Sequence, residues 1–168
     1  MKLTFQKHFI KVGKKGIFGV LEIRFKTKMM QSIKHTFHID ASFEKVYEAL
    51  TTIEGLSGWW TTDTVGGEGL GDALYFTFGE YATFEMQIAL LDKNKLVNWK
   101  FLSGNPDWEG TYMTFILSEN DNKVMVEFIH EEFKDDYSSI GNINFTWGRY
   151  LSSLRDLCET GEGQPFHQ

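Results

Sequence analysis

The sequence predicts an α+β protein in which one strand, two short helices and a run of antiparallel strands precede a long C-terminal helix. Three observations support this order. Residues 33–39 and five later segments alternate apolar with polar side chains, which is typical of strands with one buried face. Residues 43–60 and 143–158 repeat apolar side chains every three or four positions, as helices do. Turn sequences rich in Gly, Asn and Asp separate the strand-like segments.

The first strand and the helices after it have clear boundaries. Ile33, Phe37 and Ile39 share one face of the strand, and Ser42 follows as a plausible N-cap. Helical spacing then continues to Gly55, and GLSGWW forms a second short helical turn. The helical positions of the first helix are Phe43, Val46, Tyr47 and Leu50.

Five strand-like segments follow the two short helices. They are ALYFTFG, YATFEMQIALL, LVNWKFLSG, TYMTFILSE and KVMVEFIHEEF. The last element is an amphipathic helix near residues 145–159 that Gly161 ends. We expect Trp147, Leu151 and Leu154 of this helix to be buried against the sheet.

The composition favours one domain with an aromatic interior. The chain has 168 residues, including 15 Phe, 6 Tyr and 5 Trp, so rings must fill the core or border a cavity inside it. Its single cysteine, Cys158, excludes an intrachain disulfide and a cysteine cluster for a metal. We therefore expect no metal site and no cofactor, and a reducing, cytoplasmic setting.

Charge divides the chain into two parts. Residues 1–28 hold 8 of the 17 Lys and Arg and one acid, Glu22, which leaves 9 basic and 22 acidic residues in the remainder. Such an acidic body should repel nucleic acid. We interpret residues 1–28 as a basic N-terminal extension, either a hairpin or an appendage, and residues 29–168 as the domain. No apolar run is long enough to insert into a membrane.

The ordered segments resemble the START-like (SRPBCC) superfamily, in the branch related to the C-terminal domain of the activator of the Hsp90 ATPase. The pieces that carry the resemblance span roughly residues 31–166 and are FEKVYEALTTIEGLSGWWT, VGGEGLGDALYFTFG, LVNWKF, VEFIHEEF and TWGRYLSSLRDLCETGEGQPF. The resemblance implies a helix-grip fold, in which a curved antiparallel sheet of six to seven strands wraps around the C-terminal helix. It implies nothing for residues 1–28, which have no counterpart in the pattern.

A groove between such a sheet and its helix must be filled or must enclose a cavity. Alternation and helical spacing predict that the side chains facing the groove bind an apolar or aromatic ligand, and a solid aromatic core is the alternative for each ring. His130 could anchor a ligand or be a structural histidine. The predicted ligand-binding residues are Trp59, Trp60, Phe78, Phe84, Trp99, Trp108, Tyr112, His130, Trp147, Tyr150 and Leu151. No residue is predicted to be catalytic.

Two adjacent tryptophans, Trp59 and Trp60, lie between the short helices and the glycine-rich segment VGGEGLGD. We expect this segment to be a turn that forms a movable lid over the groove. Neighbouring positions at a helix end point about 100° apart. We therefore expect Trp60 to face the pocket and Trp59 to pack on the short helices.

Three functions are compatible with these features. The first is a non-enzymatic binding protein for a small hydrophobic molecule. The second is a cyclase or aromatase-type enzyme, which the superfamily includes and which would use the same cavity. The third is a co-chaperone that contacts Hsp90. It has the least support, because the activator of the Hsp90 ATPase joins its START-like domain to a separate N-terminal domain. The 28 basic residues here are too few to replace that domain. An exposed edge strand or the hairpin-like extension of residues 1–28 could also pair two copies into a homodimer.

Overall fold

The computed structural model describes residues 31–133 and 138–167, so the predictions for the basic N-terminal extension lie outside the described residues. The described chain confirms the predicted α+β order and has a sheet of seven strands. Its elements are β1 (Ile33–Ile39), α1 (Phe43–Thr51), α2 (Ile53–Trp59), β2 (Asp63–Gly66), β3 (Ala73–Phe78), β4 (Ala82–Asp92), β5 (Leu96–Ser103), β6 (Tyr112–Asn120), β7 (Lys123–Glu131) and α3 (Ile140–Thr160).

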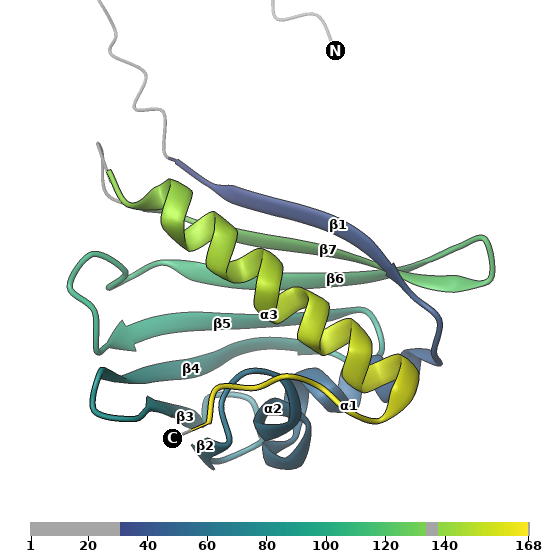
Figure 1. Ribbon diagram of the computed structural model, residues 1–168, viewed down its shortest axis with the longest axis horizontal. Helices are drawn as coiled ribbons and strands as arrows, with labels where there is room; N and C mark the ends of the chain where they lie inside the picture. Colours follow the sequence, from purple (N-terminus) through teal and green to yellow (C-terminus); the bar gives the residue numbers. More distant parts are fainter. Residues whose placement is uncertain (1–30, 134–137, 168) are drawn as a thin grey trace, which may run out of the picture.

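The strands form an antiparallel sheet in the order β1-β7-β6-β5-β4-β3-β2. Figure 1 shows α3 crossing one face of this sheet, with α1 and α2 beside its C-terminal half. Trp147, Leu151 and Leu154 are buried on the face of α3 that meets the sheet, as predicted. This arrangement is the helix-grip fold.

Two irregularities in the pairing of β4 with β5 help the sheet to curve around α3. The pairing between β4 and β5 shifts register between Glu85 and Met86 and again between Ile88 and Leu90. Extra residues in one strand of a pair bend it and increase its twist. The curved face therefore forms a groove, and α3 lies in it.

Helices α1 and α2 are joined without a loop. The Ser42 hydroxyl accepts a hydrogen bond from the Lys45 amide at 3.2 Å, which confirms Ser42 as the N-cap of α1. Thr52 ends α1 and also caps α2, accepting from the Gly55 amide at 3.0 Å. A Cβ on Gly55 would lie 2.5 Å from the Cα of Ala49, so only glycine allows this close approach.

Strand β2 was not predicted from the sequence. Its four residues pair with β3 at the edge of the sheet, within the segment that we interpreted as a turn. Four residues ending in glycine are too few to show alternation. The turn after β2 is fixed to α2, because a Glu68 carboxylate oxygen accepts a hydrogen bond from the Ile53 amide at 2.7 Å.

The C-terminal tail returns from α3 to the sheet edge, as Figure 1 shows. Phe166 donates its amide to the Trp60 carbonyl at 2.9 Å and accepts from the Thr62 amide at 3.1 Å. The buried Ser153 hydroxyl of α3 donates to the Trp59 carbonyl at 2.9 Å and accepts from the Gln164 amide at 2.6 Å. These bonds hold the tail beside the two tryptophans.

No helix in the described part of the chain combines the length and hydrophobicity needed to span a bilayer.

Candidate functional site

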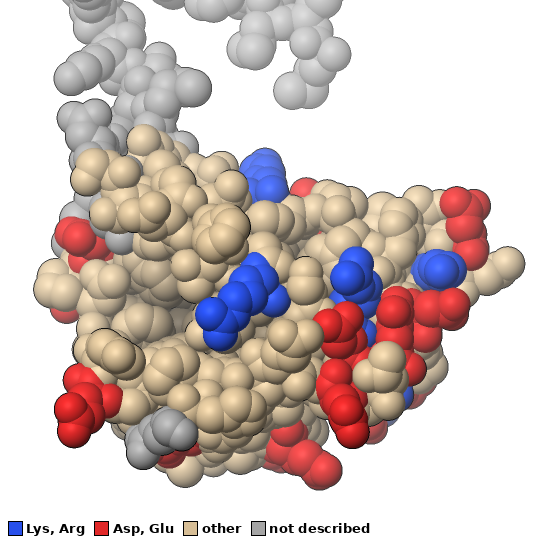
Figure 2. Space-filling view, in the orientation of Figure 1, with Lys and Arg blue, Asp and Glu red and all other residues tan. Residues whose placement is uncertain are grey.

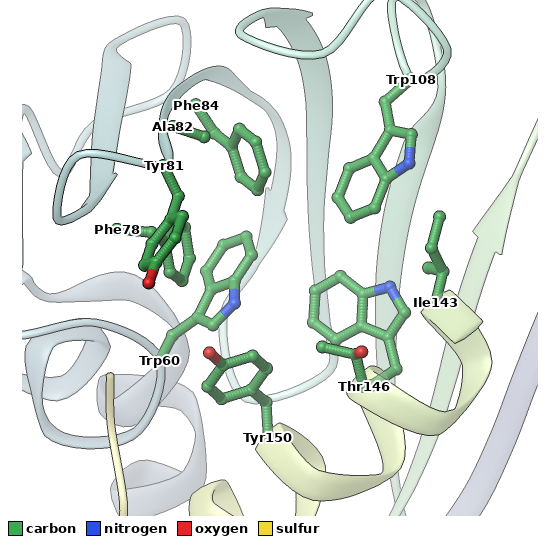
Figure 3. Close-up of a pocket in the computed structure, with 10 residues that line it drawn as sticks. Trp60, Phe78, Tyr81, Ala82, Phe84, Trp108, Ile143, Thr146 and Tyr150 are labelled. Atoms are coloured by element: carbon green, nitrogen blue, oxygen red, sulfur yellow. The ribbon is translucent and has the colours of Figure 1, made fainter. Parts of the chain in front are cut away.

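An aromatic pocket opens between the first half of α3 and the β3–β4 half of the sheet. Its volume is about 270 Å³. Figure 3 shows its walls converging from four parts of the chain, namely the end of α2, the β3–β4 hairpin, the β5–β6 loop and α3. The lining residues are Trp60, Phe78, Tyr81, Ala82, Phe84, Trp108, Ile143, Thr146, Trp147 and Tyr150.

Regular spacing on two elements produces two of these walls. Ile143, Thr146, Trp147 and Tyr150 lie three, four and seven positions apart, so they share one face of α3. Ala82 and Phe84 are two positions apart in β4 and point to the same side of the sheet. The pocket is therefore a consequence of helical and strand periodicity.

Trp60 forms the wall between the pocket and the core. Its ring stacks with that of Trp59, at 5.7 Å between centroids and 10° between planes, and with that of Trp99, at 5.9 Å and 7°. Trp59 is fully buried behind it and donates its indole N–H to the Ala49 carbonyl of α1 at 2.9 Å. The two tryptophans thus lie as expected, Trp60 on the pocket and Trp59 on the short helices.

His130 lies outside the pocket, in a closed hydrogen-bond chain. The Trp147 indole N–H donates to His130 Nδ1 at 3.1 Å, and His130 Nε2 lies 3.0 Å from the Thr111 hydroxyl. An indole N–H can only donate, so Nδ1 must carry no proton and Nε2–H donates to Thr111. Burial lowers the pKa of His130 to about 3, which keeps the ring neutral. His130 is a structural histidine in this arrangement.

Two polar groups of the pocket, by contrast, have no partner among the described residues. The Trp60 indole N–H and the Tyr150 hydroxyl form no hydrogen bond with any described residue, although Trp60 is 2% and Tyr150 7% exposed. Figure 3 shows both groups on the same side of the pocket, with the Trp60 nitrogen on the side of its ring that faces Tyr150. Burial raises the pKa of Tyr150, so its hydroxyl stays protonated. Both groups can donate to a ligand.

The positively charged side chain of Arg149 lies next to Tyr150, on the α3 wall of the pocket. The Arg149 guanidinium carbon lies 5.1 Å from the centroid of the Tyr150 ring, a cation–π contact. Arg149 is exposed and forms no ion pair with the described residues. Figure 2 shows a hollow between α3 and the β3–β4 hairpin that is surrounded mainly by uncharged surface, with Lys or Arg on the α3 side.

The structure brings six of the eleven predicted site residues to the pocket. These are Trp60, Phe78, Phe84, Trp108, Trp147 and Tyr150.

The other five lie elsewhere. Trp59 and Trp99 are buried on the core side of Trp60, and His130 is buried beside Trp108 and Trp147. Tyr112 lies on the opposite face of the sheet, where the Lys100 ammonium is 5.9 Å from its ring, because strand alternation places it opposite the buried Met113. Leu151 also meets the sheet but lies toward β1, near His35, since it is 100° around the helix from Tyr150.

Sequence reasoning missed four lining residues. Ile143 and Thr146 are one helical turn before Trp147 and Tyr150, so extending the aromatic face backwards along α3 would have found them. Ala82 precedes Phe84 by two positions in β4 and shares its face. Tyr81 belongs to the β3–β4 turn, where no periodic signal exists.

The expected lid has a different structure. The glycine-rich segment after Trp60 forms β2 and its turn, and none of its residues lines the pocket. The C-terminal tail is nearer to the opening, because Phe166 packs on Phe78 at 5.6 Å and on Tyr81 at 6.3 Å between ring centroids. Phe166 and Tyr81 therefore form the edge of the pocket on this side.

Within the described residues no group of three His, Cys, Asp or Glu side chains is placed to bind a metal ion. Cys158 is buried, and burial raises the pKa of its thiol to about 11. Neither feature competes with the aromatic pocket as a candidate site.

The fold and pocket can now be compared with known proteins. The family model described as Activator of Hsp90 ATPase homolog 1-like protein matches residues 40–159. A solution structure of the Aha1 dimer from Colwellia psychrerythraea is 35% identical, with a TM-score of 0.73, and the alignment covers 80% of this chain and 100% of that one. A search of curated proteins gave no significant match.

More distant structures share the fold alone. Protein SSP2350 from Staphylococcus saprophyticus is 20% identical, with a TM-score of 0.67 over 80% of this chain and 97% of that chain. CalU16 from Micromonospora echinospora is 15% identical, with a TM-score of 0.66 over 80% of this chain and 78% of that chain. The match over residues 40–159 and the 35% identical structure show that the chain belongs to the family of Activator of Hsp90 ATPase homolog 1-like proteins.

Proposed function

We propose that this protein binds a small apolar or aromatic molecule in the pocket between α3 and the β3–β4 hairpin, without catalysing a reaction on it. The observation that carries the proposal is an open aromatic pocket of about 270 Å³. It lies beside a core that is otherwise filled by side chains, many of them aromatic. An apolar cavity of roughly 150 Å³ is enough to bind benzene in another protein. The pocket is larger than that cavity and open on one side, so it can take a molecule of two or three rings.

The chemistry of the lining favours binding over catalysis. General acid–base catalysis needs groups whose pKa lies near the working pH and whose side chains meet at one point. The only titratable lining residues are Tyr81 and Tyr150, and burial raises the pKa of Tyr150 further from neutrality. A cyclase-type reaction in this pocket would have to rely on the shape of the pocket, which would hold the substrate in a folded conformation, and on neutral hydrogen-bond donors.

A neutral fluorescent probe, N-phenyl-1-naphthylamine, tests this function. We expect it to bind the wild-type protein with micromolar affinity, measured from the rise in its own emission. Ala82→Leu places extra methyl groups inside the pocket and should weaken binding about tenfold, since a filled pocket excludes the ring. Equal affinities for wild type and Ala82→Leu would contradict the proposal.

Ala89→Leu is the matched control. Ala89 belongs to the same strand and is also half-buried, but it does not line the pocket. It should leave the probe affinity within about twofold of wild type. A loss equal to that of Ala82→Leu would show that the probe reports the stability of β4 rather than the pocket.

The family match favours contact with Hsp90 as a second candidate function. The chain is 35% identical to a protein named Aha1. We expect such a contact to appear as a change in the ATPase rate of a purified Hsp90 when this protein is added in increasing amounts. An unchanged rate up to a large molar excess would count against this candidate and would leave the ligand-binding proposal intact.

The same relative favours self-association, because its structure is described as a dimer. In this sheet β1 is an edge strand of seven residues, and its outer edge is not paired with another described strand. We propose that two copies associate. Light scattering during size-exclusion chromatography should give twice the chain mass of 19.4 kDa, and a monomer at all concentrations tested would refute it.

A further inference from the structure

The pocket combines an apolar interior with hydrogen-bond donors and a cation on one side. Its walls are carbon-rich, and the Trp60 indole N–H and the hydroxyls of Tyr81 and Tyr150 form no hydrogen bond with the described residues. An indole N–H is a donor only, and a protonated phenol can donate too. A ligand must therefore supply hydrogen-bond acceptors on this side of the pocket.

The position of Trp60 makes its unpaired donor informative. The residue is 2% exposed and lines the pocket, and its indole N–H has no partner among the described residues. The neighbouring tryptophans Trp59 and Trp147 each donate to a protein acceptor, at 2.9 Å and 3.1 Å. Trp147 also lines the pocket but donates to His130, whereas the Trp60 N–H has no protein acceptor among the described residues and remains available to a ligand. The Trp99 N–H lacks a partner too, but Trp99 does not line the pocket.

Arg149 adds charge complementarity. Its guanidinium carbon is 5.1 Å from the ring centroid of Tyr150, so the Tyr150 ring holds a cation beside the group that lines the pocket. Arginine has several N–H donors in a plane and pairs well with carboxylate, sulfonate or phosphate oxygens. Arg149 has no acidic partner among the described residues, so its donors are available.

We propose that the ligand is an apolar acid, whose ring or chain fills the pocket while its anionic group lies between Trp60, Tyr150 and Arg149. This inference rests on the proposed binding function and specifies the chemistry of its ligand. The apolar part supplies affinity through burial, and the donors orient the anion. A molecule of the same shape without an acceptor would leave the Trp60 N–H unpaired.

Two probes with the same aromatic framework test the role of charge. 1-Anilinonaphthalene-8-sulfonate carries a sulfonate, and N-phenyl-1-naphthylamine is the same framework without it. We expect Arg149→Gln to weaken binding of the sulfonate about three- to fivefold, the range for an exposed charge pair, and to change binding of the neutral probe less than twofold. Raising the salt concentration should weaken binding of the sulfonate only.

Arg155→Gln is the control for nonspecific attraction of the anion. Arg155 is the other arginine of α3 and is exposed, but it lies near His35 rather than near the aromatic pocket. It should leave both affinities within about twofold of wild type. Tyr150→Phe supplies a second variant, which keeps the ring and should weaken the sulfonate about threefold by removing one donor.

The outcomes separate this inference from the function on which it rests. If Ala82→Leu leaves both probes unaffected, the binding function itself is wrong. If the neutral probe depends on Ala82 while Arg149→Gln and Tyr150→Phe leave the sulfonate unaffected, the pocket is a binding site but the ligand is not an acid. Equal losses of the sulfonate in Arg149→Gln and Arg155→Gln would also overturn the inference.

Discussion

The two halves of the interface between α3 and the sheet use the same kinds of side chain but satisfy their polar atoms differently. On the β6–β7 half, Trp147, His130 and Thr111 bond to one another, and aromatic rings fill the space around them. On the β3–β4 half, the donors of Trp60 and Tyr150 face a pocket of about 270 Å³ and bond to no described residue. The hydrogen bonds of the first half hold α3 on the sheet, whereas the donors of the second half remain available to a ligand.

Substitution of the adjacent tryptophans, Trp59 and Trp60, should have the largest effect and tests this difference between the two halves. Trp59→Ala and Trp60→Ala each remove a buried indole, so each should lower the free energy of unfolding by about 3–5 kcal/mol. Only Trp60 lines the pocket, so only Trp60→Ala should abolish binding of N-phenyl-1-naphthylamine. Urea unfolding measures the first effect, and titration below the unfolding transition measures the second.

This prediction fails if both variants lose stability equally while both bind the probe normally. That result would make Trp60 part of the scaffold in the same way as Trp59. Direct excitation of the probe is the required readout, because each variant removes one of the five tryptophans that could transfer energy to it.

Removing the centre of the closed network should have the next largest effect. His130→Ala leaves the buried Trp147 N–H and the Thr111 hydroxyl without their partner and also creates a cavity. We expect a loss of about 3 kcal/mol in the free energy of unfolding. Because His130 does not line the pocket, the affinity of the folded protein for the neutral probe should stay within about twofold. A tenfold loss of affinity without a loss of stability would place His130 in the binding site instead.

The same histidine predicts how stability depends on pH. Its pKa is lowered from 6.5 to about 3 in the folded protein by burial. Between these values the unfolded chain binds a proton that the folded chain does not, so stability falls as pH decreases from about 6.5 toward 3. From pH 7 to pH 5 the contribution of His130 should be a loss of about 2 kcal/mol.

Carboxyl groups also titrate in acid, so the comparison requires a variant. His130→Gln lacks the titrating ring but retains an amide that can donate and accept. Its unfolding free energy should decrease less than that of wild type between pH 7 and pH 5, by about the 2 kcal/mol assigned to the histidine. Parallel pH profiles for the two proteins would show that His130 is protonated equally in the folded and unfolded states.

The periodic parts of this architecture could be predicted from the sequence, whereas the parts set by packing could not. Alternation and helical spacing identified six of the seven strands and all three helices, and they placed Trp147, Leu151 and Leu154 in the core. Strand β2 has four residues and no pattern of its own. It forms because it can pair with the outer edge of β3, and that edge exists only in the assembled sheet.

The pocket residues divide in the same way, into those that periodicity could predict and those that depend on packing. Residues on strongly periodic elements, such as Phe84 and Tyr150, were assigned to the pocket and line it. Tyr112 was also assigned to it, although its neighbours Met113 and Phe115 show that it faces the other way. The separation of Trp99 from the pocket could not have been predicted, because only the packed structure shows Trp60 stacked across it.

The smallest expected effect concerns Thr146, on the pocket wall formed by α3. Its hydroxyl donates to the Asn142 carbonyl at 2.9 Å, and Figure 3 shows its methyl group on the side of Trp60 and Tyr150. Thr146→Ser removes this methyl group and keeps the hydroxyl. It should weaken the binding of N-phenyl-1-naphthylamine by about two- to fourfold, the effect of losing one buried methyl group. Thr146→Val keeps the methyl group and should bind within about twofold of wild type. If Thr146→Val were the weaker binder, the hydroxyl would be the group that contacts the ligand, and the α3 wall would contribute a polar contact that its bond to Asn142 does not predict.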